Sequence, residues 1–150
     1  MCVLRVTGRT FDPDTYLATS GLTACRVFRV GEPRFASRPD GPRLESSGFT
    51  VDVSERAWSD LAGQIEDAVV FMRTHGADIA MLRSVAGVED LRLDFPVDLR
   101  IDRDNVMTQF EYLPPALVSL AGSLDLGIEL SIYPPDLERL ASGEGRGPVS

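Results

Sequence analysis

Hydrophobic and polar residues alternate over several stretches of this chain, most regularly from Leu124 to Tyr133. The even positions there are Leu or Ile, and the odd positions are polar or glycine, apart from the closing Tyr133. Side chains at every second position of a β-strand lie on one face, so this stretch predicts a strand with one buried face. Alternation and strand-favouring residues predict further strands at residues 2–8, 23–31, 49–53, 91–101 and 106–113.

Two of these strands carry additional signals. Pro96 falls within 91–101 and has no N–H to donate, which predicts that the strand is an edge strand there or breaks in two. Turn-forming residues at 102–105 precede 106–113, so the latter is expected to be the returning strand of a hairpin.

Hydrophobic residues that recur at spacings of three and four predict the main helix, from Ser54 to His75. We expect Ser54 to cap this helix and Gly76 to close it. Shorter helices or helical turns are predicted at 12–21, 77–87 and 114–122, of which the first and last have a proline near their start. The buried stripe of the main helix is expected to consist of Trp58, Leu61, Ile65, Val69 and Met72.

Together these elements predict one α+β domain over residues 1–140, a mixed, mostly antiparallel sheet with one long helix and two shorter helices. The length of 150 residues suits a single domain. A helix followed by a strand occurs at 12–30 and again at 114–132, which suggests a weak internal duplication. The small, polar residues 141–150 are predicted to be a disordered tail.

The composition limits the classes of partner. A net charge of −8 opposes binding to nucleic acid or to an anionic membrane, and it favours a basic protein partner. All 15 basic residues are arginine, so a Schiff-base lysine and a phosphate-loop lysine are excluded.

Few residues are suited to metal or nucleophilic chemistry. Cys2 and Cys25 are expected to be small buried residues of a protein in a reducing compartment, the cytoplasm. His75, the only histidine, is expected at a helix end, where the helix dipole favours a positive side chain. Two separated cysteines and one histidine give no zinc-ligand spacing, so we expect no metal and no cofactor. No apolar run approaches the length that a membrane span needs.

The polar faces of the predicted strands hold the candidate interaction face. Its carboxylates would either meet a partner or simply lie in solvent, and arginines among them, Arg92 and Arg100, would form weak surface pairs. If burial instead drove the carboxylate pKa values apart, the cluster would suit acid–base work. The residues of this candidate face are Asp94, Asp98, Glu111, Glu129 and Tyr133.

A second candidate site lies in the long segment 31–48, which is rich in glycine and proline. Arg34, Arg38 and Arg43 concentrate positive charge there, and guanidinium groups suit anionic ligands. The spacing matches no phosphate-binding motif, so a solvated loop or a loop that contacts a partner is favoured over an anion site.

The chain resembles a bacterial family of small α+β domains of unknown function. The resemblance covers nearly the whole chain and rests on Pro13, Gly21, Gly31 and Gly48, on "LPPAL" and on the closing "IELSIY". The family supplies no catalytic residues. Its members are similar to proteins encoded near bacterial toxin systems, which implies an immunity or interaction role.

We therefore expect a non-catalytic bacterial cytoplasmic protein, a protein-interaction module of the immunity type that uses an acidic sheet face. The alternative is a small-molecule-binding or carboxylate-dependent enzyme domain around the same acids. A third hypothesis is a homodimer formed through an exposed strand edge.

Overall fold

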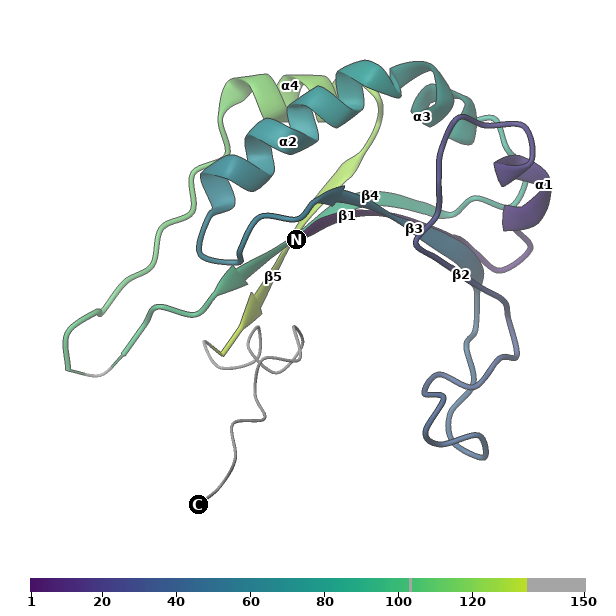
Figure 1. Ribbon diagram of the computed structural model, residues 1–150, viewed down its shortest axis with the longest axis horizontal. Helices are drawn as coiled ribbons and strands as arrows, with labels where there is room; N and C mark the ends of the chain where they lie inside the picture. Colours follow the sequence, from purple (N-terminus) through teal and green to yellow (C-terminus); the bar gives the residue numbers. More distant parts are fainter. Residues whose placement is uncertain (103, 135–150) are drawn as a thin grey trace.

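In the computed structural model, which describes residues 1–102 and 104–134, helices cover one face of a five-stranded sheet (Figure 1). This arrangement confirms the α+β class. The predicted tail at 141–150 lies outside the described residues. The strands are β1 Cys2–Gly8, β2 Arg26–Phe28, β3 Ser47–Ser54, β4 Asp90–Asp98 and β5 Gly127–Tyr133. The helices are α1 Pro13–Leu17, α2 Leu61–Thr74, α3 Gly76–Leu82 and α4 Pro115–Ser123.

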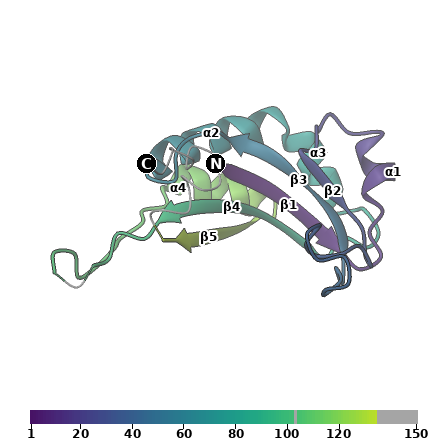
Figure 2. The same ribbon diagram turned by 60° about the horizontal axis from the view of Figure 1, so that its bottom comes forward.

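The sheet is mixed and mostly antiparallel, as the sequence predicts. Its strand order is β2-β3-β1-β4-β5. The central strand β1 is antiparallel to both neighbours, and β2 is antiparallel to β3. Only the β4–β5 pair among the described strands is parallel. A parallel pair needs a crossover, and here α4 lies in the connection between the two strands. The strands curve into an arch beneath the helices (Figure 2).

The core fills the space between this sheet and the helices. Leu4, Val6, Phe49, Leu93 and Phe95 are fully buried on the helix side of the sheet. On the helices, buried residues follow the three- and four-residue spacing of an amphipathic stripe. In α2 they include Leu61, Ile65, Ala68 and Met72.

The main helix is shorter than predicted. It begins at Leu61, because Asp60 caps it by accepting a hydrogen bond from the backbone N–H of Gly63 at 2.9 Å. Ser54 ends β3 instead, and its hydroxyl donates to Asp67 at 2.7 Å. Trp58 precedes α2 and does not belong to the buried stripe. At the other end, Gly76 does not close a helix but begins α3.

Of the two alternatives predicted at Pro96, the break is wrong and the local edge is confirmed. Strand β4 runs through Pro96 without interruption, and at Pro96 it is paired with β5 but not with β1. Strand β1 pairs with β4 only as far as Asp94, opposite Val3. Beyond that point the Pro96 carbonyl accepts a hydrogen bond from Nε2 of the fully buried Gln64 at 3.0 Å. The backbone nitrogen of Pro96 points to the same side, where β1 has ended, so its missing N–H costs no ladder bond.

The prediction of a returning strand at 106–113 is also wrong. The described residues of 99–114 form an arm that projects beyond the sheet (Figure 1). A side chain rather than a strand ladder holds the arm together. Gln109 accepts from the Arg100 N–H at 2.8 Å and donates to the Asp98 carbonyl at 2.9 Å. At the turn, the Asp102 carboxylate accepts backbone N–H bonds, which lower its pKa.

The two predicted helix–strand units lie at opposite edges of the sheet. Helix α1 precedes the edge strand β2, and α4 precedes the other edge strand β5. Their sizes differ, with five and three residues in the first unit and nine and seven in the second. The duplication therefore stays a hypothesis.

Candidate functional site

Helices cover one face of the sheet, and the other face, which we call the open sheet face, turns away from them (Figure 2). Residues that pair across neighbouring strands lie on the same face of the sheet, and the open sheet face is the one that contains Arg5 and its cross-strand partners. Their neighbours in sequence, such as Leu4 and Val6, are buried in the core on the opposite face. The open sheet face comprises Arg26, Phe28, Val3, Arg5, Thr7, Gly48, Thr50, Asp52, Asp90, Arg92, Asp94, Pro96, Asp98, Gly127, Glu129, Ser131 and Tyr133.

Two arginines occupy directly opposed positions on this face. Arg5 of β1 pairs in register with Arg92 of β4, an arrangement that would repel without counter-charges. Arg92 binds two carboxylates, Asp90 at 2.6 Å and Glu129 of β5 at 2.9 Å. The hydrogen bond to Asp90, with that to Glu129 added, raises the pKa of Arg92, so it stays charged.

Asp94 is the most enclosed carboxylate of the open sheet face, with only 7% of its surface exposed. It receives a hydrogen bond from Arg5 at 3.3 Å and one from the Ser131 hydroxyl at 2.6 Å. Such hydrogen bonds replace the water that a carboxylate loses when it is buried. The contacts join β1, β4 and β5 into one charged surface, in which Asp94 fixes the positions of the side chains that bind it.

Four of the five predicted face residues belong to this surface. Asp94 pairs in register with Glu129, and Asp98 pairs with Tyr133 at the end of the same strands. The Tyr133 ring also packs against Trp58, with 4.7 Å between ring centroids. Glu111 lies elsewhere, on the arm 99–114, where it accepts from Arg100 at 2.8 Å and from Gln109 at 2.7 Å. The structure does not bring Glu111 into the carboxylate group of β4 and β5.

Two projections extend from the sheet, the arm 99–114 and the loop 31–46 (Figure 1). The arm exposes large hydrophobic side chains, with Met107 90%, Phe110 82% and Tyr112 74% exposed. The loop exposes Phe35 to a lesser degree, and Val30, which directly precedes the loop, is similarly exposed. Exposed aromatic and Met side chains that cluster on a protruding segment are typical of residues that become buried in a protein interface.

Backbone hydrogen bonds hold the loop 31–46 together across its base. The Gly31 N–H donates to Leu44 O at 2.8 Å, and the Arg34 N–H donates to Pro42 O at 2.9 Å. The three arginines predicted as an anion or partner site make different contacts. Arg43 donates to Gly31 O at 2.7 Å, and Arg34 lies over the Phe35 ring at 5.9 Å. Arg38 donates its backbone N–H to Phe35 O.

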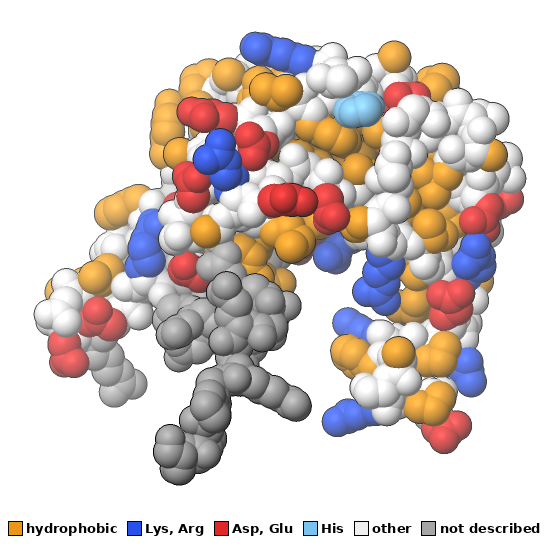
Figure 3. Space-filling view, viewed as in Figure 1, with side chains coloured by type: hydrophobic (Ala, Val, Ile, Leu, Met, Phe, Trp, Pro, Cys, Tyr) orange, Lys and Arg blue, Asp and Glu red, His pale blue; other side chains and the backbone are white. Residues whose placement is uncertain are grey.

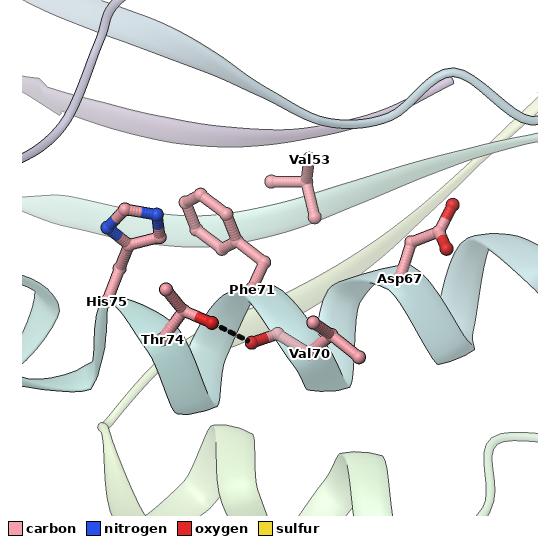
Figure 4. A pocket seen from close by; sticks show the side chains of 6 residues that line it. All are labelled: Val53, Asp67, Val70, Phe71, Thr74 and His75. Atoms are coloured by element: carbon pink, nitrogen blue, oxygen red, sulfur yellow. Dashed lines mark hydrogen bonds between the residues drawn. The ribbon is translucent and has the colours of Figure 1, made fainter.

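A shallow hollow of about 340 Å³ lies on the helix side, between α2 and β3. Phe71 and Val53 form its apolar centre, and Asp67 and His75 stand at opposite ends (Figure 4). The hydrophobic patch beside the single histidine is visible on the molecular surface in Figure 3. Asp67 already binds Ser54 and Arg56, and His75 Nδ1 lies 3.9 Å from Asp78. The hollow therefore suits an apolar side chain better than acid–base chemistry.

The cysteines differ from the expectation of two buried residues. Cys2 is buried, and burial raises the pKa of its thiol, which keeps it protonated. Cys25 is exposed and hydrogen-bonds to Thr50 of β3. Among residues 1–102 and 104–134, no group of three or more His, Cys, Asp or Glu side chains is arranged to hold a metal ion. Within the same ranges, every helix is too short or too polar to cross a membrane.

Sequence reasoning missed Arg5 and Ser131, the two residues that hold Asp94. Both occupy polar positions of alternating strands, so the sequence predicts that they lie on the polar faces of these strands. Their contact with Asp94 was not, because it depends on which strands are neighbours and in what register. Comparisons of this chain with family models, with curated proteins and with solved structures found no match.

Proposed function

We propose that this protein is a non-catalytic protein-binding module that receives a basic partner on the open sheet face. The observation that supports the proposal best is the one-sided fold: the helices cover one face of the sheet, and the other carries an organised charged surface. Its ionisable side chains are three arginines and five carboxylates, so the face is acidic like the chain. An acidic surface attracts a basic partner over long range and speeds its association.

The charged contacts favour recognition over acid–base catalysis. Arg92 lies between Asp90 and Glu129, and Arg5 lies against Asp94, so each of these acids already has an arginine partner. A catalytic carboxylate pair would instead need environments that separate the two pKa values. Carboxylates held on the open sheet face suit arginine or lysine side chains of a partner, which can bind them directly.

The arm 99–114 supplies the apolar part of the proposed interface. Met107, Phe110 and Tyr112 are among the most exposed hydrophobic residues of the described chain. Buried aromatic side chains contribute most of the binding energy in many interfaces, whereas charged rims set orientation and rate. We therefore propose that the arm anchors the partner and that the open sheet face orients it.

Capture from cells that produce the protein, followed by affinity measurements with the purified partner, tests the proposal. The variant is Asp52→Arg, which reverses an exposed charge on the open sheet face. The matched control is Glu66→Arg, which makes the same change of net charge on an exposed position of α2. We expect Asp52→Arg to weaken binding about tenfold or more, and Glu66→Arg to weaken it less.

Rising salt supplies an independent measurement. If surface charge steers the association, the association rate should fall as salt screens the attraction between opposite charges. The proposal fails if the captured partner is acidic, if its affinity is insensitive to Asp52→Arg, or if both charge reversals weaken binding equally. It also fails if no partner is captured.

Within this class we propose an immunity-type role, in which the module inhibits a toxin whose substrate is acidic. An enzyme that acts on a polyanion carries a basic binding surface, and an acidic face of this kind can occupy that surface in place of the substrate. The test is the toxic activity of the captured partner, measured with and without the module. Binding that leaves this activity unchanged would refute the inhibitory role while leaving the binding module intact.

A further inference from the structure

Strand β5 forms one edge of the sheet, and it lacks the features that usually protect such an edge. Among the described residues, no strand pairs with its outer side. Proteins block free edges with lysine, proline, bulges or very short strands. The other edge, β2, has only three residues. In contrast, β5 has seven, GIELSIY, with strand-favouring side chains and one charge, Glu129, already paired with Arg92.

The backbone groups that point off this edge follow from one hydrogen bond. The N–H of Leu99, just beyond β4, donates to the carbonyl of Tyr133 at 2.7 Å, so the backbone groups of Tyr133 face β4. Backbone direction alternates along a strand. The N–H and C=O groups of Ile128, Leu130 and Ile132 therefore point away from β4, on the side where no described strand pairs with β5.

We infer that two copies of this chain associate through β5 as antiparallel neighbours, with the twofold axis at Leu130. In this register Leu130 faces its copy, Ile128 faces Ile132, and all seven residues overlap. Glu129 lies opposite Ser131, so no like charges are opposed. A shift that brings Glu129 opposite its own copy would place two carboxylates together. Registers centred on any other residue of β5, such as Ser131, lose part of the overlap.

The helix side of the same edge also suits a second copy. Ile132 is 55% exposed and shares the helix-side face of β5 with Ile128 and Leu130. Helix α4 contacts β5 and exposes Val118. A side-chain Cβ added at Gly122 of α4 would meet, among the described residues, no heavy atom within 4 Å outside the backbone of α4 itself. A twofold axis at Leu130 brings both copies of α4 to the same side of a continuous sheet, where these apolar residues become covered.

Sedimentation or light scattering of the full chain, over a range of concentrations, measures the association. We use about 0.15 M salt, where screening over about 8 Å limits repulsion between two chains of net charge −8. The expected species has twice the mass of the chain. Ile132→Lys puts a charge at the edge and should weaken the dimer about tenfold or more. Val70→Lys, the same kind of change at an exposed site on α2, should leave it unchanged.

A cysteine at the axis tests the register. In a Cys25→Ser background, Leu130→Cys places two thiols on opposed residues about 5.5 Å apart between Cα atoms, within the range of a disulfide. Glu129→Cys should form a crosslink only in the alternative register, in which Glu129 lies opposite its own copy. The inference is overturned if the wild-type chain stays at monomer mass at all concentrations, even if a foreign strand binds β5. It is also overturned if Ile132→Lys leaves the dimer intact, or if Glu129→Cys crosslinks and Leu130→Cys does not.

Discussion

Replacing Gln64 by methionine tests how the sheet tolerates Pro96. Gln64 is fully buried, and its Nε2 donates to the carbonyls of Pro96 and Ala57, each at 3.0 Å. Methionine has a similar length and removes both donors while it keeps the volume. The Pro96 carbonyl would then lack a donor, since β1 ends opposite Asp94.

The expected cost follows from the environment of each carbonyl. Leaving the buried Pro96 carbonyl without a donor costs about 1–3 kcal/mol. Ala57 is exposed, so water can replace the second bond at a cost of about 1 kcal/mol or less. Gln64 Oε1 is itself buried and has no hydrogen-bond partner among the described residues, so its removal recovers about 1 kcal/mol. The two smaller contributions roughly cancel, so we expect a net loss of about 2 kcal/mol, the middle of the range for the Pro96 carbonyl, in the free energy of unfolding.

Urea denaturation at neutral pH measures this loss. Trp58, the only tryptophan, packs on Tyr133 and reports tertiary structure by fluorescence, while circular dichroism reports the helices. Gln109→Met is the control, because it removes side-chain bonds from the arm 99–114 rather than from the core, and it should cost less. A Gln64→Met variant as stable as the wild type would refute the view that Gln64 replaces a strand partner at Pro96.

Three further changes test other parts of the fold by the same denaturation assay. Gly48→Ala should destabilise the protein strongly, because the added Cβ would collide with the Val6 carbonyl oxygen. Gly122→Ala should instead raise the free energy of unfolding by about 0.5–1 kcal/mol, because none of the described atoms outside α4 would touch the added Cβ. Equal effects of the two variants would contradict the close approach of β1 to Gly48. Asp60→Ala removes the cap of α2 and should cost about 1 kcal/mol, seen as a lower urea midpoint. Burial raises the pKa of Tyr16 to about 12, so its contribution to stability is complete below about pH 10, the unfolded value, and is lost as the pH rises through 12; a Tyr16→Phe variant that loses the same stability over this range would contradict the assignment.

The fold class was predictable because alternation reports a backbone property. Side chains of a strand point to opposite faces at every second residue, whatever the neighbouring strands are. The alternating residues 2–8 and 91–98 therefore appear as β1 and most of β4, with their apolar positions buried. Segment 106–113 alternates too, but it lies on a projecting arm where none of the described strands is its neighbour. Alternation predicts a strand only where a partner strand exists.

The start of the main helix was predicted too early, because Asp60 and not Ser54 is its N-cap. Ser54 and Asp60 are both suitable N-cap residues, and Trp58 continues the helical spacing upstream of Leu61. In the structure Ser54 completes β3 and binds Asp67, while Trp58 reaches Tyr133 on the most distant strand. Neither contact can be inferred from local spacing, because each joins residues from separate elements.

The sequence predicts on which side of their strands the candidate face residues lie, but not which ion pairs they form. The polar positions of the two strands place Asp94 and Glu129 on one surface once β4 and β5 are neighbours. The registers of β4 with β1 and β5 then decide the ion pairs, since they set Arg5 opposite Arg92 and Ser131 near Asp94. Which carboxylate is enclosed and which is exposed thus depends on strand order, a long-range property.

The two proposed surfaces are distinct, and their energetics are linked. Ile132→Lys acts on the strand edge, whereas Asp52 lies on the open sheet face of β3, so each variant probes one proposal. A dimer through β5 would extend the open sheet face across both copies. A partner long enough to contact both would bind the dimer more tightly than the single chain, and by mass action it would stabilise the dimer. Ile132→Lys should then lower the affinity for such a partner, while binding of the partner to a single copy of the chain persists. Asp52→Arg should weaken partner binding without changing the mass of the free protein.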